Sequence, residues 1–184
     1  MKQNRNDFQL NVFKMNLDLN DQRCLEAATG WLELGNHLEA NEELENITPQ
    51  MRAHPAVLLV RYEVYAKAEK WDGASEIAGA LVKLLPEQPS VWICLAYATR
   101  RKPNGGIPEA MKILLEAESK FPRVCQFPFN IACYCSQKFD FEEAERWLKK
   151  AIAIDEKTVQ KLAIDDPDLL PLWDSMGGTL WKRV

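Results

Sequence analysis

The chain has 184 residues, of which 47% are hydrophobic and 27% are charged, and its formal net charge is −4. This composition is typical of a folded globular protein and excludes an extensively disordered one. The acidic balance argues against broad nucleic-acid binding, which needs a clustered excess of Lys and Arg. No stretch approaches the roughly 18 consecutive apolar residues of a membrane-spanning helix, so we expect no membrane partner.

The five cysteines are odd in number and lack the paired spacing of a secreted disulfide framework. The N-terminal residues lead into no secretory apolar core, because polar residues interrupt it at Asn11, Lys14, Asn16 and Asp18. We therefore expect reduced thiols and a cytoplasmic location.

Residues 1–19 differ in pattern from the rest of the chain. Phe8, Leu10 and Val12 alternate with polar residues, and the alternation resumes after a one-residue slip at Phe13 and Met15. This period of two is typical of an extended chain rather than of a helix. Two alternatives stay open: a partly ordered tail that covers the first helices, or a segment that lies extended along its own body or along a neighbouring copy.

Residues 20–155 have apolar residues at helical spacing. Turn-forming residues divide this region into pairs of helices and are found at 35–36, 71–73 and 102–106. The pairs predict four repeat units, at about 20–54, 55–88, 89–124 and 125–155.

The ends of this region are expected to be specialised. We expect Asn20 or Asp21 to cap the first helix. After the last pair, residues 158–164 are predicted to form another helix, and residues 165–168 to start a short one. Because the terminal elements of a solenoid must close its core against water, we predict a helical cap at 156–176 and a tail at 177–184.

Four alanines give the period of the repeat. Ala40, Ala74, Ala110 and Ala144 lie 34, 36 and 34 residues apart, and the residues four positions after them are Leu44, Ala78, Leu114 and Leu148. A small residue lets two helices cross at close range. The two extra residues of the middle interval fall in the turn at 102–106. A fixed period of this length predicts an all-α, right-handed solenoid of about four helical hairpins.

The repeats resemble the tetratricopeptide repeat (TPR). The third unit matches the TPR signature at Trp92, Leu95, Ala96, Ala110, Leu114 and Pro122, and the second at Leu58, Tyr62, Tyr65, Ala74, Ala78 and Pro86. The Gly of the signature is replaced by Ala28, Tyr62, Ala96 and Ala132, which implies a looser helix contact at Tyr62. The segment from Asn130 to Cys135, together with that from Asp165 to Leu169, looks like the ending of small bacterial TPR proteins. One branch of that group is kinesin-light-chain-like and is associated with bacterial tubulins.

The resemblance implies a protein-binding function. One known use of the family is the capture of acidic chaperone C-termini by Lys and Asn side chains. The matching positions here hold Leu25, Thr29, Val60, Ser90 and Cys94. The clamp is therefore absent, and a role as a chaperone cofactor is disfavoured.

In such arrays the first helix of each hairpin lines a concave face, and this register predicts a groove that mixes apolar anchors with a basic stretch. The candidate partner-binding residues are Leu59, Glu63, Lys67, Ile93, Tyr97, Arg100, Arg101, Phe129 and Gln137. A protein segment with hydrophobic and acidic residues suits this groove, because Arg offers paired hydrogen bonds to a carboxylate. The alternative is a solvated basic run that stabilises the end of a helix.

Other motifs favour structural roles. Cys133 and Cys135 point about 200° apart on a helix, so we expect buried apolar side chains rather than metal ligands. The acidic run at 165–168 is typical of a helix start. Gly105-Gly106 lacks the Lys-Ser/Thr of a phosphate-binding loop, and no nucleophilic triad has an elbow to carry it. We expect no metal, no cofactor and no enzymatic activity.

Together these features predict a non-enzymatic scaffold that binds a segment of another protein through the concave TPR groove. The alternative is a structural adaptor that decorates a bacterial tubulin filament through its convex face or its loops. The oligomeric state stays open, since the N-terminal segment also suits exchange between protomers.

Overall fold

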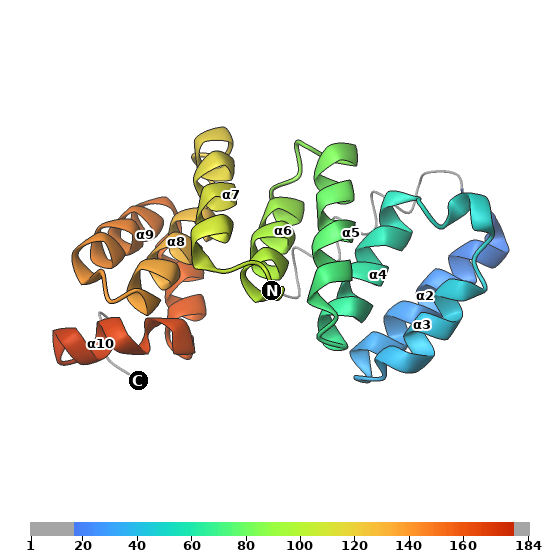
Figure 1. Cartoon of the computed structure of the whole chain (residues 1–184), viewed down its shortest axis with the longest axis horizontal. Coiled ribbons are helices and arrows are strands. Elements are labelled where there is room, and N and C mark those ends of the chain that lie inside the picture. Colours follow the sequence, from blue (N-terminus) through green and yellow to red (C-terminus); the bar gives the residue numbers. More distant parts are fainter. Residues whose placement is uncertain (1–16, 179–184) are drawn as a thin grey trace. The chain divides into compact units, whose positions relative to one another are not determined.

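The computed structural model describes residues 17–178, and every regular element in that range is helical (Figure 1). This confirms the all-α prediction. Of the predicted extended segment, residues 1–16 lie outside the described residues. The predicted tail lies outside them from residue 179 onward. The elements in chain order are α2 (Leu19–Glu33), α3 (His37–Glu45), the 3₁₀ turn η1 (Pro49–Met51), α4 (Pro55–Lys67), α5 (Trp71–Leu84), α6 (Pro89–Arg101), α7 (Ile107–Lys120), α8 (Gln126–Gln137), α9 (Phe141–Ala163), η2 (Pro167–Leu169) and α10 (Leu170–Met176).

The chain divides into two compact units, Met1–Asn104 and Gly105–Val184. In the first unit α2 packs against α3 and α5 packs against both α4 and α6; in the second unit α8 packs against α7, α9 and η2 (Figure 1). The division falls between α6 and α7, inside the predicted third repeat. The boundaries of the four repeats stay a prediction.

The periodic alanines lie in the second helix of each predicted pair, at the most buried positions. Ala40, Ala74, Ala110 and Ala144 are each 0% exposed, and so are the residues four positions after them. A methyl group is the largest side chain that such a close helix contact admits without pushing the helices apart. The register deduced from the period therefore matches the packing of α3, α5, α7 and α9.

The first helix begins earlier than predicted. Asp18 is its N-cap, and the Asp18 carboxylate accepts a hydrogen bond from the Asp21 N–H at 2.8 Å. The expectation that Asn20 or Asp21 caps this helix is therefore wrong. Asp21 is instead 1% exposed and accepts the Thr48 N–H at 2.8 Å, which ties α2 to the chain that follows α3.

The turns within three of the helix pairs share one conformation. Gly35, Glu69 and Phe139 each lie five residues before a periodic alanine, and their φ angles are 83°, 55° and 60°. A left-handed residue is a common way to end a helix. Only Gly adopts this conformation without strain, and a non-Gly residue costs about 1–2 kcal/mol there.

Helix α9 contains a break at Asp155, next to the predicted start of the C-terminal cap. Asp155 has non-helical angles, φ −156° and ψ 89°, and its carboxylate accepts both the N–H and the hydroxyl of Thr158, at 3.1 and 2.6 Å. The Asp166 carboxylate likewise accepts the Asp168 N–H at 2.9 Å. The predicted helix-start role of the acidic run is thus observed at Asp166, and η2 with α10 follows it.

Gly73 marks the closest approach within the α4–α5 pair. A Cβ atom added at Gly73 would overlap Cδ1 and Cε1 of the Tyr65 ring. Gly79 lies on the same helix, but a Cβ there would meet nothing closer than Leu95 Cδ1 at 4.0 Å. Substitution of Gly73 therefore tests the space next to the Tyr65 ring, whereas substitution of Gly79 tests helix propensity.

We predict that Glu69→Gly raises the free energy of unfolding by about 0.5–1 kcal/mol, because the strain relieved exceeds the entropy that Gly loses on folding. Gly35→Ala is the matched reverse change and should lower stability by about 1 kcal/mol. Urea titration of the full chain, followed by far-UV circular dichroism, measures both. Equal stability of Glu69→Gly and the wild type would contradict the role of the left-handed turn.

We predict that Gly73→Ala destabilises the protein by about 1–3 kcal/mol, because the added methyl group displaces the Tyr65 ring. Gly79→Ala on the same helix should be neutral or stabilising by up to about 1 kcal/mol. The same titration compares them. If both variants gained stability, the close contact between Gly73 and Tyr65 would be refuted.

Candidate functional site

The predicted partner-binding residues belong to both units. The first unit holds Leu59, Glu63 and Lys67 on α4 together with Ile93, Tyr97, Arg100 and Arg101 on α6, whereas the second holds Phe129 and Gln137 on α8. The α4 and α6 residues thus belong to one compact unit.

Tyr62 joins α4 to α6 where the TPR signature has glycine. Its side chain is buried, and its hydroxyl donates to the Cys94 carbonyl oxygen at 3.1 Å. Burial raises the pKa of the Tyr62 phenol above its usual range, so the hydroxyl keeps the proton that it donates. The Tyr62 ring thus occupies the space of the looser helix contact expected there, and its hydrogen bond to Cys94 links α4 to α6.

Lys67, Arg100 and Arg101 lie at the C-terminal ends of α4 and α6. The short connections at 68–70 and 85–88 each reverse the chain, so α4 and α6 run in the same direction. Lys67 occupies the last turn of α4, and the two arginines occupy the last turn of α6. Positive charges at these ends interact favourably with the helix dipoles. Lys67 is exposed, whereas Arg100 and Arg101 are half-buried.

Arg101 is stacked on an aromatic pair. Its guanidinium carbon lies 3.4 Å from the centroid of the Tyr97 ring and 5.5 Å from that of Trp71. The two rings meet edge to face, with centroids 5.7 Å apart, and Arg101 Nη1 donates to the Tyr97 carbonyl oxygen at 3.3 Å. Cation–π stacking of this kind holds the plane of the guanidinium in place. We call Trp71, Tyr97 and Arg101 the aromatic–basic cluster.

Trp71 is the member of this cluster that the sequence did not reveal. The i, i+4 spacing of Tyr97 and Arg101 predicts that they share a helix face, but Trp71 was expected in a turn and instead begins α5. In the structure Trp71 is half-buried. Trp31 and Trp147 are also partly exposed, whereas Trp92 and Trp173 are buried.

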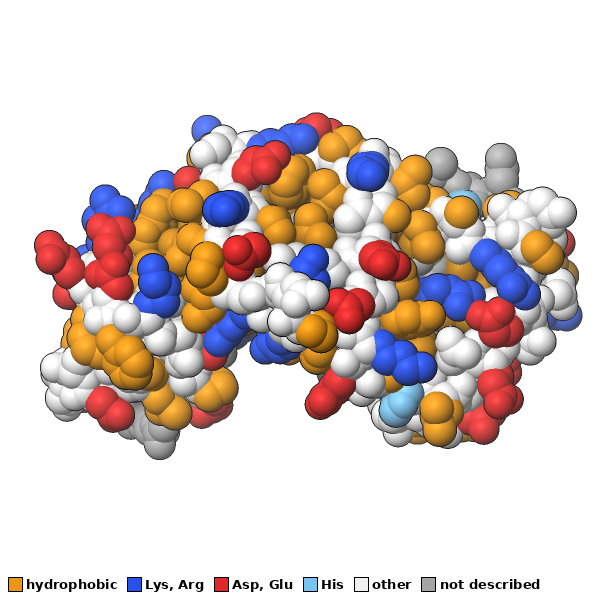
Figure 2. Space-filling view, viewed as in Figure 1, with side chains coloured by type: hydrophobic (Ala, Val, Ile, Leu, Met, Phe, Trp, Pro, Cys, Tyr) orange, Lys and Arg blue, Asp and Glu red, His pale blue; other side chains and the backbone are white. Residues whose placement is uncertain are grey.

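Arg52 and Arg61 of the first unit form ion pairs with Glu45. Glu45 binds Arg61 Nη1 at 2.7 Å and Arg52 Nη1 at 3.0 Å. The hydrogen bond from Arg61 holds the pKa of the Glu45 carboxyl below its usual value. Figure 2 shows neighbouring basic and acidic side chains in this part of the molecule, at the right, over the first hairpin and α4. This ion-paired group is a poor candidate for binding a partner's carboxylate.

The α8 candidates have structural roles. Phe129 is 4% exposed, so its ring belongs to the core of the second unit and offers no anchoring surface; its selection as an exposed groove residue is corrected. The helical register placed it on the expected face of α8, but that face is covered. Gln137 Nε2 donates to the Asp168 carbonyl oxygen at 3.1 Å and holds η2 against the end of α8.

Metal, thiol and membrane features can be assessed over residues 17–178. No group of three or more His, Cys, Asp or Glu in this range could hold a metal ion. Cys133 and Cys135 are 2% and 7% exposed, as expected of buried apolar side chains, and burial raises the pKa of the Cys135 thiol. No helix in the same range is long and apolar enough to cross a membrane.

No family model and no curated protein matches the sequence. The fold does match solved structures. A thermophilic TPR protein of Thermus thermophilus, TTC0263, is 21% identical over 85% of this chain and 83% of its own, with a TM-score of 0.66. Two structures of TPR-like repeats of a putative kinesin light chain from Podospora anserina are also 21% identical, cover 88% of both chains and have TM-scores of 0.58 and 0.57.

These similarities agree with the alanine register, the paired helices and the repeated left-handed turns. Each match spans most of both chains, so the likeness concerns the repeat array as a whole. At 21% identity it concerns the fold and not the partner. The chain therefore has the tetratricopeptide-repeat fold.

Proposed function

We propose that this protein is a non-enzymatic scaffold that binds a segment of another protein through the surface at the C-terminal ends of α4 and α6. The TPR fold supports protein–protein interaction in general. The observation that carries the finer proposal is the aromatic–basic cluster, in which Arg101 lies on Tyr97 with Lys67 and Arg100 at the same end of the unit.

The chemistry of the cluster favours a carboxylate next to an apolar side chain. Beyond the N–H that Arg101 donates to the Tyr97 carbonyl oxygen, its guanidinium has further N–H groups that can form two parallel hydrogen bonds to a carboxylate. Tyr97 is 41% exposed and supplies aromatic surface beside the charge. Since the stacking fixes Arg101 in advance, binding needs less ordering of the receptor.

A filament adaptor is the second candidate function. The observation in its favour is the similarity to the TPR-like repeats of a putative kinesin light chain. Such an adaptor would bind assembled bacterial tubulin rather than a soluble peptide. Co-sedimentation with polymerised and unpolymerised tubulin separates the two functions, because only the adaptor is enriched with polymer.

The cysteines support a cytoplasmic setting. All five lie in the described part of the chain, and none of them forms a disulfide bond. Cysteines without disulfide bonds are typical of proteins in reducing compartments. We therefore place the proposed partner in the cytoplasm as well.

We predict that Arg100→Glu with Arg101→Glu weakens partner binding by roughly 100-fold or more, because two charge-assisted hydrogen bonds of about 1.5–3 kcal/mol each are replaced by repulsion. A partner is first identified by cross-linking and mass spectrometry with the wild-type chain. Its binding segment is then titrated against each variant by calorimetry, at two salt concentrations.

The matched control is Lys83→Glu with Lys112→Glu, which changes the net charge equally at two exposed positions on α5 and α7. We expect the control to bind like the wild type and both variants to keep wild-type helicity. Unchanged affinity of the Arg100/Arg101 variant would move the binding site off this surface.

A further inference from the structure

The outer face of α2 is polar where the same face of α4 is apolar. Val57, Val60 and Val64 on α4 are buried in one core with the first hairpin. The residues 34 positions earlier, which occupy the same register on α2, are Arg23, Glu26 and Gly30. On α4 this face packs against the first hairpin. The corresponding face of α2 exposes Arg23 and Glu26 instead.

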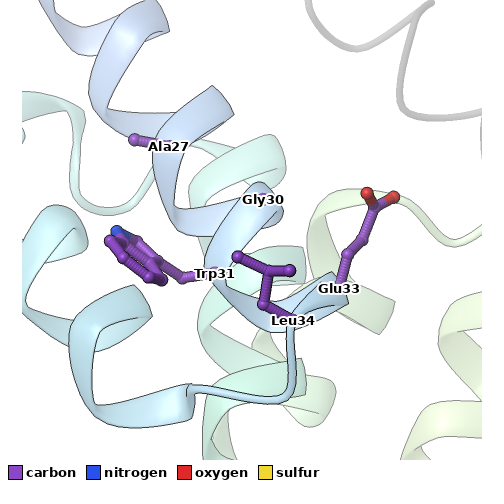
Figure 3. Close-up of a pocket in the computed structure, with 5 residues that line it drawn as sticks. All are labelled: Ala27, Gly30, Trp31, Glu33 and Leu34. Carbon is purple, nitrogen blue, oxygen red and sulfur yellow. The ribbon is translucent and has the colours of Figure 1, made fainter.

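A shallow apolar hollow lies on this side of α2. It is lined by Ala27, Gly30, Trp31, Glu33 and Leu34 (Figure 3). A Cβ atom added at Gly30 would meet nothing within 4 Å, so the missing side chain leaves open space. Trp31 is half-buried and Leu34 is 77% exposed. In Figure 3 their side chains lie beside each other, and the Glu33 carboxylate points away from the Trp31 ring.

The first hairpin, which carries the hollow, is rich in acidic residues. Residues 17–51 contain eight Asp and Glu residues and, among Lys and Arg, only Arg23. The exposed carboxylates include Glu26 and Glu33 on α2 and Glu39 and Glu42 on α3. An occupant of this surface would therefore combine an apolar side chain for the hollow with positive charge for its surroundings.

The 16 residues that precede the described structure have this composition. They carry Lys2, Arg5 and Lys14 against one acidic residue, Asp7, and their apolar side chains include Phe8, Leu10, Val12, Phe13 and Met15. The point where this segment joins the fold is fixed. Leu17 is 4% exposed in the core of the first hairpin, and Gln22 Nε2 donates to its carbonyl oxygen at 2.8 Å.

The segment is long enough to reach the hollow. From Leu19 to Gly30 the axis of α2 rises about 16 Å at 1.5 Å per residue. An extended chain advances about 3.3 Å per residue, so the nine residues from Leu17 back to Phe8 span up to about 30 Å. We propose that residues 1–16 lie along the uncovered face of α2 of the same chain, with an apolar side chain from residues 8–13 in the hollow at Gly30.

A photo-crosslinking amino acid at Leu34 tests this occupant in the full chain, since Leu34 is highly exposed and its replacement leaves the core intact. We expect crosslinks to residues 8–13 of the same chain. The matched control is the same crosslinker at Leu84 on α5, which is 51% exposed in the same unit and should not crosslink to residues 1–16.

A mixture of isotope-labelled and unlabelled protein separates the possible occupants. Crosslinks within single chains support the proposal, whereas mixed-isotope crosslinks would assign the hollow to a second copy and overturn it. Absence of any crosslink from Leu34 to residues 1–16 would overturn it as well.

Filling the hollow provides a second measurement. Gly30→Leu places an apolar side chain in the open space and replaces Gly within a helix, which favours folding. We expect the crosslink yield at Leu34 to fall about tenfold or more, because burying one large apolar side chain shifts an equilibrium by at least that factor. An unchanged yield in a normally folded Gly30→Leu variant would contradict occupancy of the hollow by this segment.

Discussion

The close crossing of paired helices is the constraint on which the rest of the structure depends. The periodic alanines of α3, α5, α7 and α9 have no exposed surface, and a small side chain is what lets two helices pack closely. At other helix contacts the residues that satisfy this constraint are of a different size. Gly73 makes room for the Tyr65 ring, whereas at Tyr62 a large side chain spans two helices and ends in a hydrogen bond to Cys94. Small and large residues thus serve one purpose, which is a filled contact at a fixed helix separation.

The architecture could be predicted because its signals are local and repeated. The alanine period, the turn residues and the helical stripes each depend on neighbours within one hairpin, and four copies reinforce one another. The first N-cap could not be predicted in the same way. Asp18 and Asp21 have the same capping chemistry, and what separates them is the hydrogen bond from Thr48, 27 residues away from Asp21. The sequence around α2 does not contain that contact.

The candidate site shows the same division between local and long-range information. The register of α4 and α6 placed Lys67, Tyr97 and Arg101 without any tertiary information. The register did not identify Phe129 as buried, because the direction in which a side chain leaves a helix does not determine its exposure. Helix α8 is packed against α7, α9 and η2, and most of its residues are buried. The register also missed Trp71, which reaches Arg101 from another helix. Burial and contacts between helices are collective properties, and a pattern along one helix does not encode them.

The lengthened turn at 102–106 separates the proposed surface from the second unit along the chain. The other three turns carry a left-handed residue five positions before the periodic alanine, whereas in this turn Gly106, four positions before Ala110, has a φ of 142°. Arg101 ends α6 and Asn104 ends the first unit, so the aromatic–basic cluster is complete within that unit. Recognition through it therefore requires no fixed placement of the second unit. Because Tyr97 and Arg101 are about one helical turn apart, roughly 5.4 Å along the axis, a segment bound there must carry its carboxylate and its apolar side chain within a few residues of each other.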